Sequence, residues 1–215
     1  MNDYQTDFIQ LALENEVLRF GEYELKSGRV SPYFFNAGLI RSGAALRRTG
    51  LAYVETIRAA NISFDMLFGP AYKGIPLATA AAVCWNERYE ADIPVVYNRK
   101  EAKTHGEGGS IVGGPLQGKV LIVDDVITAG TAVREVLQMI EDAGAEPAGI
   151  VVGLDRQERG KGEMSAIQEL QQEYDLPVAA IISFANLITF LESSTGRYMD
   201  NLPEMNAYRS QYGIS

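Results

Sequence analysis

The sequence predicts an α/β fold in which a mostly parallel sheet carries helices on both faces. Short apolar runs rich in β-branched residues, which are typical of buried strands, occur near residues 66, 95, 122, 152 and 180. Segments with helical spacing of apolar residues separate these runs. Strands that alternate with helices form parallel sheets through right-handed crossovers. With 215 residues, 47% of them apolar, we expect one domain with a sizeable core.

The N-terminal part differs from this alternation. Residues 4–18 predict an amphipathic helix, because Phe8, Leu11 and Leu18 recur at helical spacing. The next segment predicts two strands around a turn at residues 26–29. The other strands are expected at 66–68, 94–97, 120–123, 149–154 and 178–182. The other helices are expected at 43–60, 75–88, from residue 133 to a stop at Gly144, and at 165–174, 184–194 and 203–211.

Composition excludes several classes of protein. A net charge of −9 and a pI near 4.7 argue against a nucleic-acid-binding surface, which is normally basic. A single cysteine, Cys84, allows no intramolecular disulfide, and its apolar helical surroundings predict a buried thiol. The N-terminus does not resemble a signal peptide, and no apolar run approaches the roughly 20 residues that span a bilayer. We therefore expect a cytoplasmic protein without membrane or nucleic-acid partners.

The most informative stretch runs from Val120 to Ala132. Asp124 and Asp125 stand at the end of a predicted strand, and a loop of small and hydroxyl residues then leads into a helix. Ligands bind at this edge of an open α/β sheet, and a helix N-terminus favours a phosphate. The stretch has neither GxxxxGK[ST] nor GxGxxG spacing. The alternative is an ordinary strand-to-helix turn whose polar residues only cap the helix.

Two further loops carry positive charge at the same edge. In residues 69–76, Lys73 and backbone amides between glycines could hold a second anion, although a plain loop is the alternative. Residues 98–115 carry three cations, the only histidine and several glycines, which suits a lid that closes over a polyanion. The alternative there is a solvated hairpin tip.

A last cationic loop follows the strand at 149–154. Arg156 is placed to reach the shared edge, whereas Arg159 and Lys161 are expected to be solvated. Together the loops suit a ligand with a phosphate at one end and a more highly charged group at the other. The two aspartates between them suit sugar hydroxyls and, directly or through water, a divalent cation.

The stretch from Val120 to Ala132 resembles the signature with which type I phosphoribosyltransferases bind phosphoribosyl pyrophosphate (PRPP). The similarity extends over essentially the whole chain to the bacterial orotate phosphoribosyltransferases. The residues that carry it are Lys26, Phe34, Phe35, Tyr72, Lys73, Arg99, Lys100, Lys103, His105, the segment from Asp124 to Ala132, and Arg156.

The resemblance implies transfer of the phosphoribosyl group of PRPP to orotate, forming orotidine 5′-phosphate and pyrophosphate in pyrimidine (UMP) synthesis. It implies that Mg²⁺ arrives with PRPP, with Asp124 and Asp125 nearby and no direct protein ligand. It implies a single domain, residues 1–215, with a hood of about residues 1–40 plus the C-terminal segment and a PRPP-binding core of about 64–182. It also implies a homodimer in which the lid loop 98–109 reaches the neighbouring active site.

The resemblance also assigns residues to roles. The catalytic set is Lys103, Asp124, Asp125, His105 and Arg99. The PRPP-binding set is Tyr72, Lys73, Arg99, Lys100, Lys103, His105, Asp124, Asp125, Thr128, Ala129, Gly130, Thr131 and Ala132. The orotate-binding set is Lys26, Phe34, Phe35, Thr128 and Arg156.

Two other functions remain open at this point. One is a phosphoribosyltransferase for a purine or uracil, which the PRPP signature alone does not exclude. The other is a PRPP-sensing regulator that binds RNA or DNA on the same fold. Lys26 and Arg156 favour a base that bears a carboxylate, and the acidic pI counts against the regulator.

Overall fold

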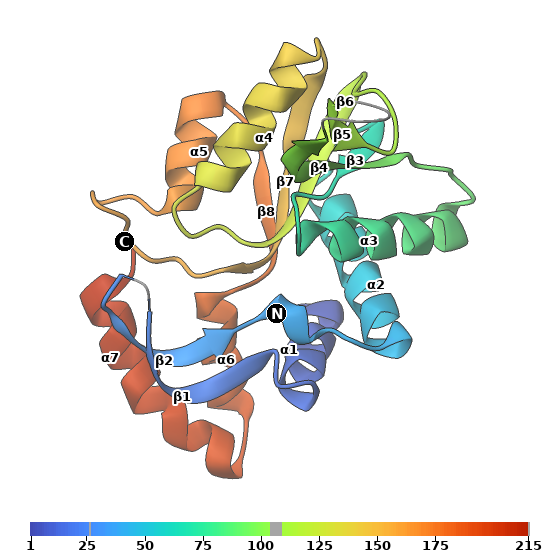
Figure 1. Cartoon of the computed structure of the whole chain (residues 1–215). Helices are drawn as coiled ribbons and strands as arrows, with labels where there is room; N and C mark the ends of the chain where they lie inside the picture. Colours follow the sequence, from blue (N-terminus) through green and yellow to red (C-terminus); the bar gives the residue numbers. More distant parts are fainter. Residues whose placement is uncertain (26, 104–108, 215) are drawn as a thin grey trace.

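The computed structural model describes residues 1–25, 27–103 and 109–214, and its centre is a six-stranded sheet (Figure 1). The strand order is β5-β4-β3-β6-β7-β8. All neighbours are parallel except β4 and β5, which are antiparallel at one edge. The bounds are β3 Met66–Phe68, β4 Val95–Lys103, β5 Gly109–Val112, β6 Lys119–Val126, β7 Glu146–Asp155 and β8 Val178–Ser183. The predicted fold class is confirmed.

Helices cover both faces of this sheet (Figure 1). Val120 and Ile122 of β6 pack in one apolar cluster with α4 and α5, and Leu121 and Val123 pack in the other with α2 and α3. Because successive strand residues point to opposite faces, a strand buried on both sides is apolar throughout. The bounds are α1 Asp3–Glu14, α2 Gly43–Ala59, α3 Gly74–Tyr89, α4 Thr131–Asp142, α5 Ala166–Tyr174, α6 Phe184–Ser193 and α7 Leu202–Tyr212.

A small second sheet lies beside the core, with α6 and α7 next to it (Figure 1). Its strands, β1 Leu18–Glu24 and β2 Val30–Phe35, are antiparallel. Leu25 and Arg29 close the turn between them, because the N–H of Leu25 donates to the carbonyl of Arg29 at 2.8 Å. The predicted strand pair is therefore confirmed. Tyr33 of β2 packs against Phe184 of α6, with 5.4 Å between ring centroids.

Several predicted elements are wrong in their bounds, and β7, expected at 149–154, begins already at Glu146. The first helix ends at Glu14 and not at residue 18, because Glu16 takes a left-handed backbone conformation (φ 58°) that breaks the helix. Leu18 is buried as expected, but in β1. The other predicted helices agree with the structure to within a residue or two.

A further error concerns the segment 98–115, which was predicted as a loop. β4 continues to Lys103 and pairs with β5, with Asn98 opposite Ile111. Residues 98–103 of the predicted lid loop 98–109 are therefore strand, and residues 104–108, including His105, lie outside the described residues. The sequence did not predict this strand because its residues are mostly charged. The partner strand, β5, follows the glycines and is not visible in the local pattern. β6 is also longer than predicted, and it contains Asp124 and Asp125.

None of the helices built by the described residues combines the length and apolar character that crossing a membrane requires. Cys84 is buried, as predicted.

Candidate active site

Three parallel strands end side by side and direct their following loops to one edge of the sheet. Phe68 of β3 lies opposite Ile122 of β6, and Val126 of β6 lies opposite Leu154 of β7. The loops that begin at residues 69, 127 and 156 therefore leave from neighbouring positions. This edge is where a doubly wound sheet binds ligands.

An ion pair joins the first two of these strand ends. Lys73 Nζ lies 2.9 Å from Asp125 Oδ2. The other oxygen of Asp125 accepts a hydrogen bond from the N–H of Val126 at 2.9 Å, so both carboxylate oxygens have partners within the protein. Asp124 Oδ1 accepts a hydrogen bond from the N–H of Asp125, also at 2.9 Å. The two carboxylates are thus held in fixed orientations at the end of β6.

Burial and the neighbouring carboxylate change the ionisation of Asp124. Burial, followed by the negative charge of Asp125, raises the pKa of the Asp124 carboxyl to about 7. The hydrogen bond from the Asp125 N–H and the charge of Lys73 act in the opposite direction but are weaker. Asp124 therefore exchanges a proton near neutral pH, and a bound cation or hydroxyl donor would favour its charged form.

Close packing fixes the loop that presents Lys73. A Cβ atom at Gly69 would lie 2.5 Å from the carbonyl oxygen of Gly74, and one at Gly74 would lie 2.8 Å from that of Val123. Only glycine fits at either position, so the loop lies directly against β6. The Asn98 side chain of β4 adds a tether, because its Oδ1 accepts a hydrogen bond from the N–H of Ala71 at 2.8 Å.

Residues of β4 and of the N-terminal segment also approach this loop. Lys100 Nζ lies 5.1 Å from the centroid of the exposed Tyr72 ring. The peptide bond between Ala71 and Tyr72 is cis. A Cβ atom at Gly38 would lie 3.9 Å from Lys73 Cε. The segment after β2 therefore borders the same edge as Lys73.

The loop after β6 opens a helix N-terminus toward the edge. Gly130 precedes α4 with a positive φ of 72°. The N–H groups of Thr131 and Ala132 lie in the first turn, where the helix itself offers no acceptor. Thr128, Ala129, Thr131 and Ala132 are exposed. Hydroxyl groups and backbone N–H groups thus lie together in the loop that is predicted to bind a phosphate.

Arg134 of α4 holds this loop in place and links it to α5. This residue was not predicted as part of the site. Its Nη1 donates to the carbonyl of Ala129 at 3.1 Å. Its Nε and Nη2 donate to Glu173 Oε2 at 2.9 and 2.7 Å. A cation in the first turn of a helix is disfavoured by the helix dipole, and that was the signal available in the sequence.

Arg156 lies at the end of β7, where it is held by charged and polar partners. Its Nε and Nη2 lie 2.8 and 2.6 Å from Glu158 Oε1, and Nη2 also donates to Ser31 Oγ at 3.1 Å. Its Cζ lies 4.4 Å from the centroid of the Tyr33 ring. Burial works against the charged guanidinium, but Tyr33 and Glu158 outweigh it and raise the Arg156 pKa. Glu158 and Ser31 were not identified from the sequence.

The two adjacent phenylalanines point to opposite faces of β2, because successive strand residues alternate. Phe35 is buried, and its ring would lie 3.6 Å from a Cβ atom at Gly153 of β7. Phe34 stacks on Tyr23 with 5.4 Å between ring centroids, and the Arg19 guanidinium lies 5.6 Å from the Phe34 ring. Only the Phe35 side chain therefore lies beside the strand ends.

The structure thus brings Lys73, Asp124 and Asp125 together, and it puts Arg156 at the end of the strand next to β6. Arg99 and Lys100 belong to β4, and so does the backbone of Lys103. Lys26 and His105 lie outside the described residues. The prediction that Arg159 is solvated is wrong, since its half-buried side chain donates to the carbonyl of Gln211 at 2.6 Å, whereas Lys161 is exposed as expected.

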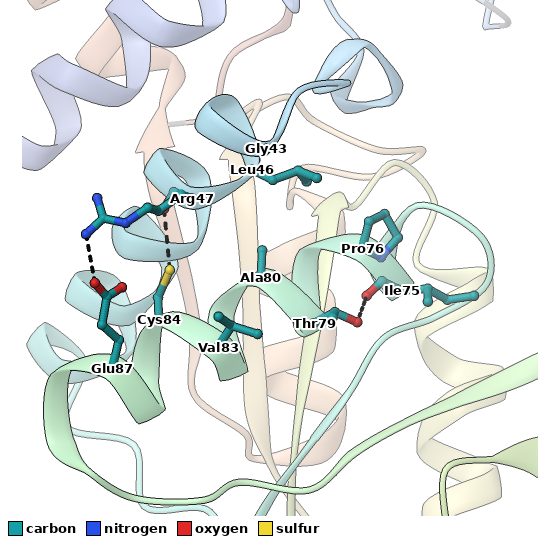
Figure 2. Close-up of a pocket in the computed structure, with 10 residues that line it drawn as sticks. All are labelled: Gly43, Leu46, Arg47, Ile75, Pro76, Thr79, Ala80, Val83, Cys84 and Glu87. Atoms are coloured by element: carbon teal, nitrogen blue, oxygen red, sulfur yellow. Dashed lines mark hydrogen bonds and ion pairs between the residues drawn. The ribbon is translucent and has the colours of Figure 1, made fainter.

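An apolar groove of about 400 Å³ lies between α2 and α3, close to this edge (Figure 2). It begins at Ile75 and Pro76, immediately after the loop of Lys73. Val83 is 63% exposed there. At the far end Arg47 forms an ion pair with Glu87, 3.0 Å apart. The remaining lining residues are Gly43, Leu46, Thr79, Ala80 and Cys84.

The chain matches a known protein family over more than half of its length. The model of the phosphoribosyl transferase domain family matches residues 43–177. The chain therefore has the domain of a phosphoribosyltransferase.

Similarities that extend over the whole chain identify a particular family within this class of protein. The chain is 57% identical to the orotate phosphoribosyltransferase of Saccharophagus degradans and 56% identical to that of Pseudomonas aeruginosa, over the full length of both chains in each case. A crystal structure of orotate phosphoribosyltransferase from Francisella tularensis is 40% identical, with a TM-score of 0.86 over 96% of this chain and 99% of that one. The chain therefore belongs to the orotate phosphoribosyltransferase family.

Proposed function

We propose that this protein transfers the phosphoribosyl group of PRPP to orotate, releasing pyrophosphate and forming orotidine 5′-phosphate in pyrimidine (UMP) biosynthesis. The observation that carries the proposal is the order of groups along one sheet edge. A cation at Lys73, a carboxylate pair at Asp124 and Asp125, and the N-terminus of α4 follow one another there. PRPP carries a pyrophosphate, a ribose and a phosphate in the same order.

Each part of PRPP has a proposed partner in this order. The 5-phosphate binds the N–H and hydroxyl groups of residues 128–132 at the start of α4. Asp124 and Asp125 accept hydrogen bonds from the ribose hydroxyls. The pyrophosphate faces Tyr72 and Lys73 and the cations of β4. The further residues proposed for this role are Arg99, Lys100 and Lys103, together with His105.

Orotate binds on the side of β2 and β7. We assign its carboxylate to Arg156, since a guanidinium donates strong charge-assisted hydrogen bonds to a carboxylate. Lys26, the backbone of Phe34 and Phe35, and Thr128 complete the proposed base site. The buried Phe35 ring beside Gly153 supports an apolar wall there. A base without a carboxylate would leave Arg156 without this partner, which favours orotate over uracil.

The chemistry then requires charge stabilisation more than proton transfer. Breaking the bond between C1 and the pyrophosphate oxygen builds positive charge on the ribose and negative charge on the leaving group. Lys73, Lys103 and Arg99 stabilise the leaving group, and the two aspartates balance the charge on the ribose. Orotate attacks through N1 as an anion, so no strong general base is needed.

Mg²⁺ is proposed to arrive bound to PRPP. Among the described residues no cluster of three or more His, Cys, Asp or Glu side chains could hold a metal ion. Asp125 has both oxygens engaged, whereas only one oxygen of Asp124 accepts a hydrogen bond. This donor set fits a hydrated cation held through water by Asp124 and Asp125. When bound, the cation neutralises charge on the pyrophosphate.

We also propose a homodimer in which the lid segment 98–109, which begins with the last residues of β4, reaches the neighbouring active site. The apolar groove between α2 and α3 supports a second copy as its occupant, because it adjoins the loop of Lys73. Tyr72, in that loop, is 68% exposed. A subunit packed on the groove would therefore also lie near the site. The Val83→Glu variant is expected to sediment as a monomer and to release less pyrophosphate in the activity assay.

One assay tests the proposed reaction. Protein, PRPP and Mg²⁺ are mixed separately with orotate, uracil, adenine and hypoxanthine, and pyrophosphate is measured. We expect release with orotate alone. Release with only another base would overturn the choice of substrate. Tight PRPP binding without turnover of any base would instead favour a regulator.

A further inference from the structure

We propose that Glu158 is a positioning residue that sets the direction in which the Arg156 guanidinium faces the base. The inference rests on the proposed function, which assigns Arg156 to the carboxylate of orotate. Glu158 itself is not proposed to contact the substrate.

The geometry around Arg156 supports this role. A single oxygen of Glu158 receives both Nε, at 2.8 Å, and Nη2, at 2.6 Å. Ser31 Oγ accepts a further hydrogen bond from Nη2. Because a guanidinium is planar and rigid, fixing Nε and Nη2 fixes the whole fork. Nη1 is the donor group that neither Glu158 nor Ser31 binds, so these contacts determine where it points.

The ring of Tyr33 removes the remaining freedom. The guanidinium carbon lies 4.4 Å from the centroid of this buried ring, which holds the fork in one plane. Only 13% of the Arg156 side chain and 14% of the Glu158 side chain are exposed. A long arginine side chain loses much rotamer freedom when it is ordered. Here the protein orders the side chain itself, so a ligand does not have to.

Glu158 is in turn held by the turn between β1 and β2. Arg29 Nη1 lies 3.8 Å from Glu158 Oε2 and donates to the carbonyl of Arg159 at 2.9 Å. The Arg29 guanidinium also lies 4.8 Å from the centroid of the Tyr212 ring of α7. The row Arg29–Glu158–Arg156 therefore links the N-terminal hairpin and the C-terminal helix to the proposed base site.

A different role would be charge compensation alone. In that case any carboxylate near Arg156 would serve, and its reach would not matter. If Glu158 acts by position, an oxygen at the right distance is required and its charge is secondary. Glutamine keeps the reach and loses the charge, and aspartate keeps the charge and loses the reach. The two roles therefore predict opposite orders for these two substitutions.

The experiment compares E158Q, E158D and E158A with wild type in steady-state kinetics with orotate and PRPP varied in turn. Losing the oxygen that holds Nε and Nη2 leaves the guanidinium unordered, and this is expected to raise the KM for orotate about tenfold or more in E158A and E158D. In E158Q this KM is expected to stay within about threefold of wild type. The KM for PRPP is expected to change less than about twofold in all three. Glu163→Gln is the control, because Glu163 lies in the same loop with its side chain 91% exposed.

Each other outcome overturns the inference. A normal KM for orotate in E158D with a raised one in E158Q would assign charge compensation. Equal increases in both KM values, together with a lower melting temperature, would assign a general structural role. Unchanged KM values in all three variants would mean that Glu158 has no role in base binding. Failure of the proposed function is seen separately, as wild-type protein that does not turn over orotate.

Discussion

Lys73 and Asp125 link the loop after β3 to the end of β6, with 2.9 Å between Nζ and Oδ2. The proposed function assigns the two residues to adjacent parts of PRPP, the pyrophosphate and the ribose. The ion pair thus fixes the spacing between the two halves of the site. Gly69 and Gly74 support it, because they allow the loop to lie against the backbone of β6.

Replacing Lys73 with alanine is expected to lower kcat/KM for PRPP about 10²-fold, because it removes one cation facing the developing pyrophosphate charge. Steady-state kinetics with PRPP varied at saturating orotate measure this. Lys119→Ala is a matched control, since Lys119 has the same side-chain exposure of 48% and pairs with Glu146 at 4.0 Å. An equal loss in both variants would contradict a specific role for Lys73.

Asp124 is expected to make the stability of the protein depend on pH. Burial and Asp125 raise the Asp124 pKa to about 7 from an ordinary value of 3.8, so the folded state binds more protons than the unfolded chain between about pH 4 and 7. Stability from this group is therefore lost as the pH rises through that window.

Asp124→Asn removes this loss. Relative to wild type, the variant is expected to gain more unfolding free energy at pH 8 than at pH 4.5. The gain is at most about 4 kcal/mol, at about 1.4 kcal/mol per pKa unit. Urea unfolding without substrates at the two pH values measures the difference. Asp92→Asn, at an exposed position, is the control. A constant difference between Asp124→Asn and wild type at both pH values would disprove the raised pKa.

Much of the fold could be predicted because the buried strands are apolar on both faces. The apolar runs at 66–68 and 120–123 are buried on both faces, as is typical of strands in the interior of a parallel sheet. The strand from Asn98 to Lys103 could not be found this way. Most of its residues are charged, and it is strand because β5, which follows the glycines in the sequence, pairs with it. Such pairing is a tertiary property that local patterns do not contain.

The residues of the candidate site also divide into those that could be predicted from the sequence and those that could not. Residues that the proposed function places against the ligand, such as Lys73 and Asp125, could be selected because their order along the chain matches the order of loops along the edge. Residues that hold them could not. Glu158 and Arg134 resemble ordinary surface charges in the sequence. They lie only two and five residues from Arg156 and Ala129, but the sequence pattern does not show that the backbone turns these neighbours toward each other.

Tyr53 is expected to stabilise the end of β6. This buried side chain of α2 donates a hydrogen bond to the carbonyl of Asp124 at 2.7 Å. Tyr53→Phe leaves that carbonyl without this donor and is expected to cost about 1 kcal/mol, or about 3 °C in melting temperature. Calorimetry measures it. Tyr97→Phe is the control, as its hydroxyl has no hydrogen bond among the residues described. Equal melting temperatures for Tyr53→Phe and wild type would contradict the predicted contribution.

Arg134 is expected to affect PRPP binding through the loop that it braces. Arg134→Met keeps the aliphatic stem but removes the donors to Ala129 and Glu173. The KM for PRPP is expected to rise about fivefold with little change in kcat, because a looser loop must be ordered by the phosphate. Arg48→Met, which breaks an ion pair with Glu14, should leave the KM unchanged. A fall in kcat alone would point to a different role for Arg134.

Lys103 is the last residue of β4, and the proposed function places its side chain against the pyrophosphate. Lys103→Ala is expected to lower kcat about 10²–10³-fold, which is the scale for losing one preorganised group that stabilises charge in the transition state. The KM for orotate should stay near its wild-type value, since the base lies on the far side of the ribose. Single-turnover measurements of pyrophosphate release separate this effect from product release. Lys161→Ala, at an exposed position, is the control, and an unchanged single-turnover rate in Lys103→Ala would remove Lys103 from the catalytic set.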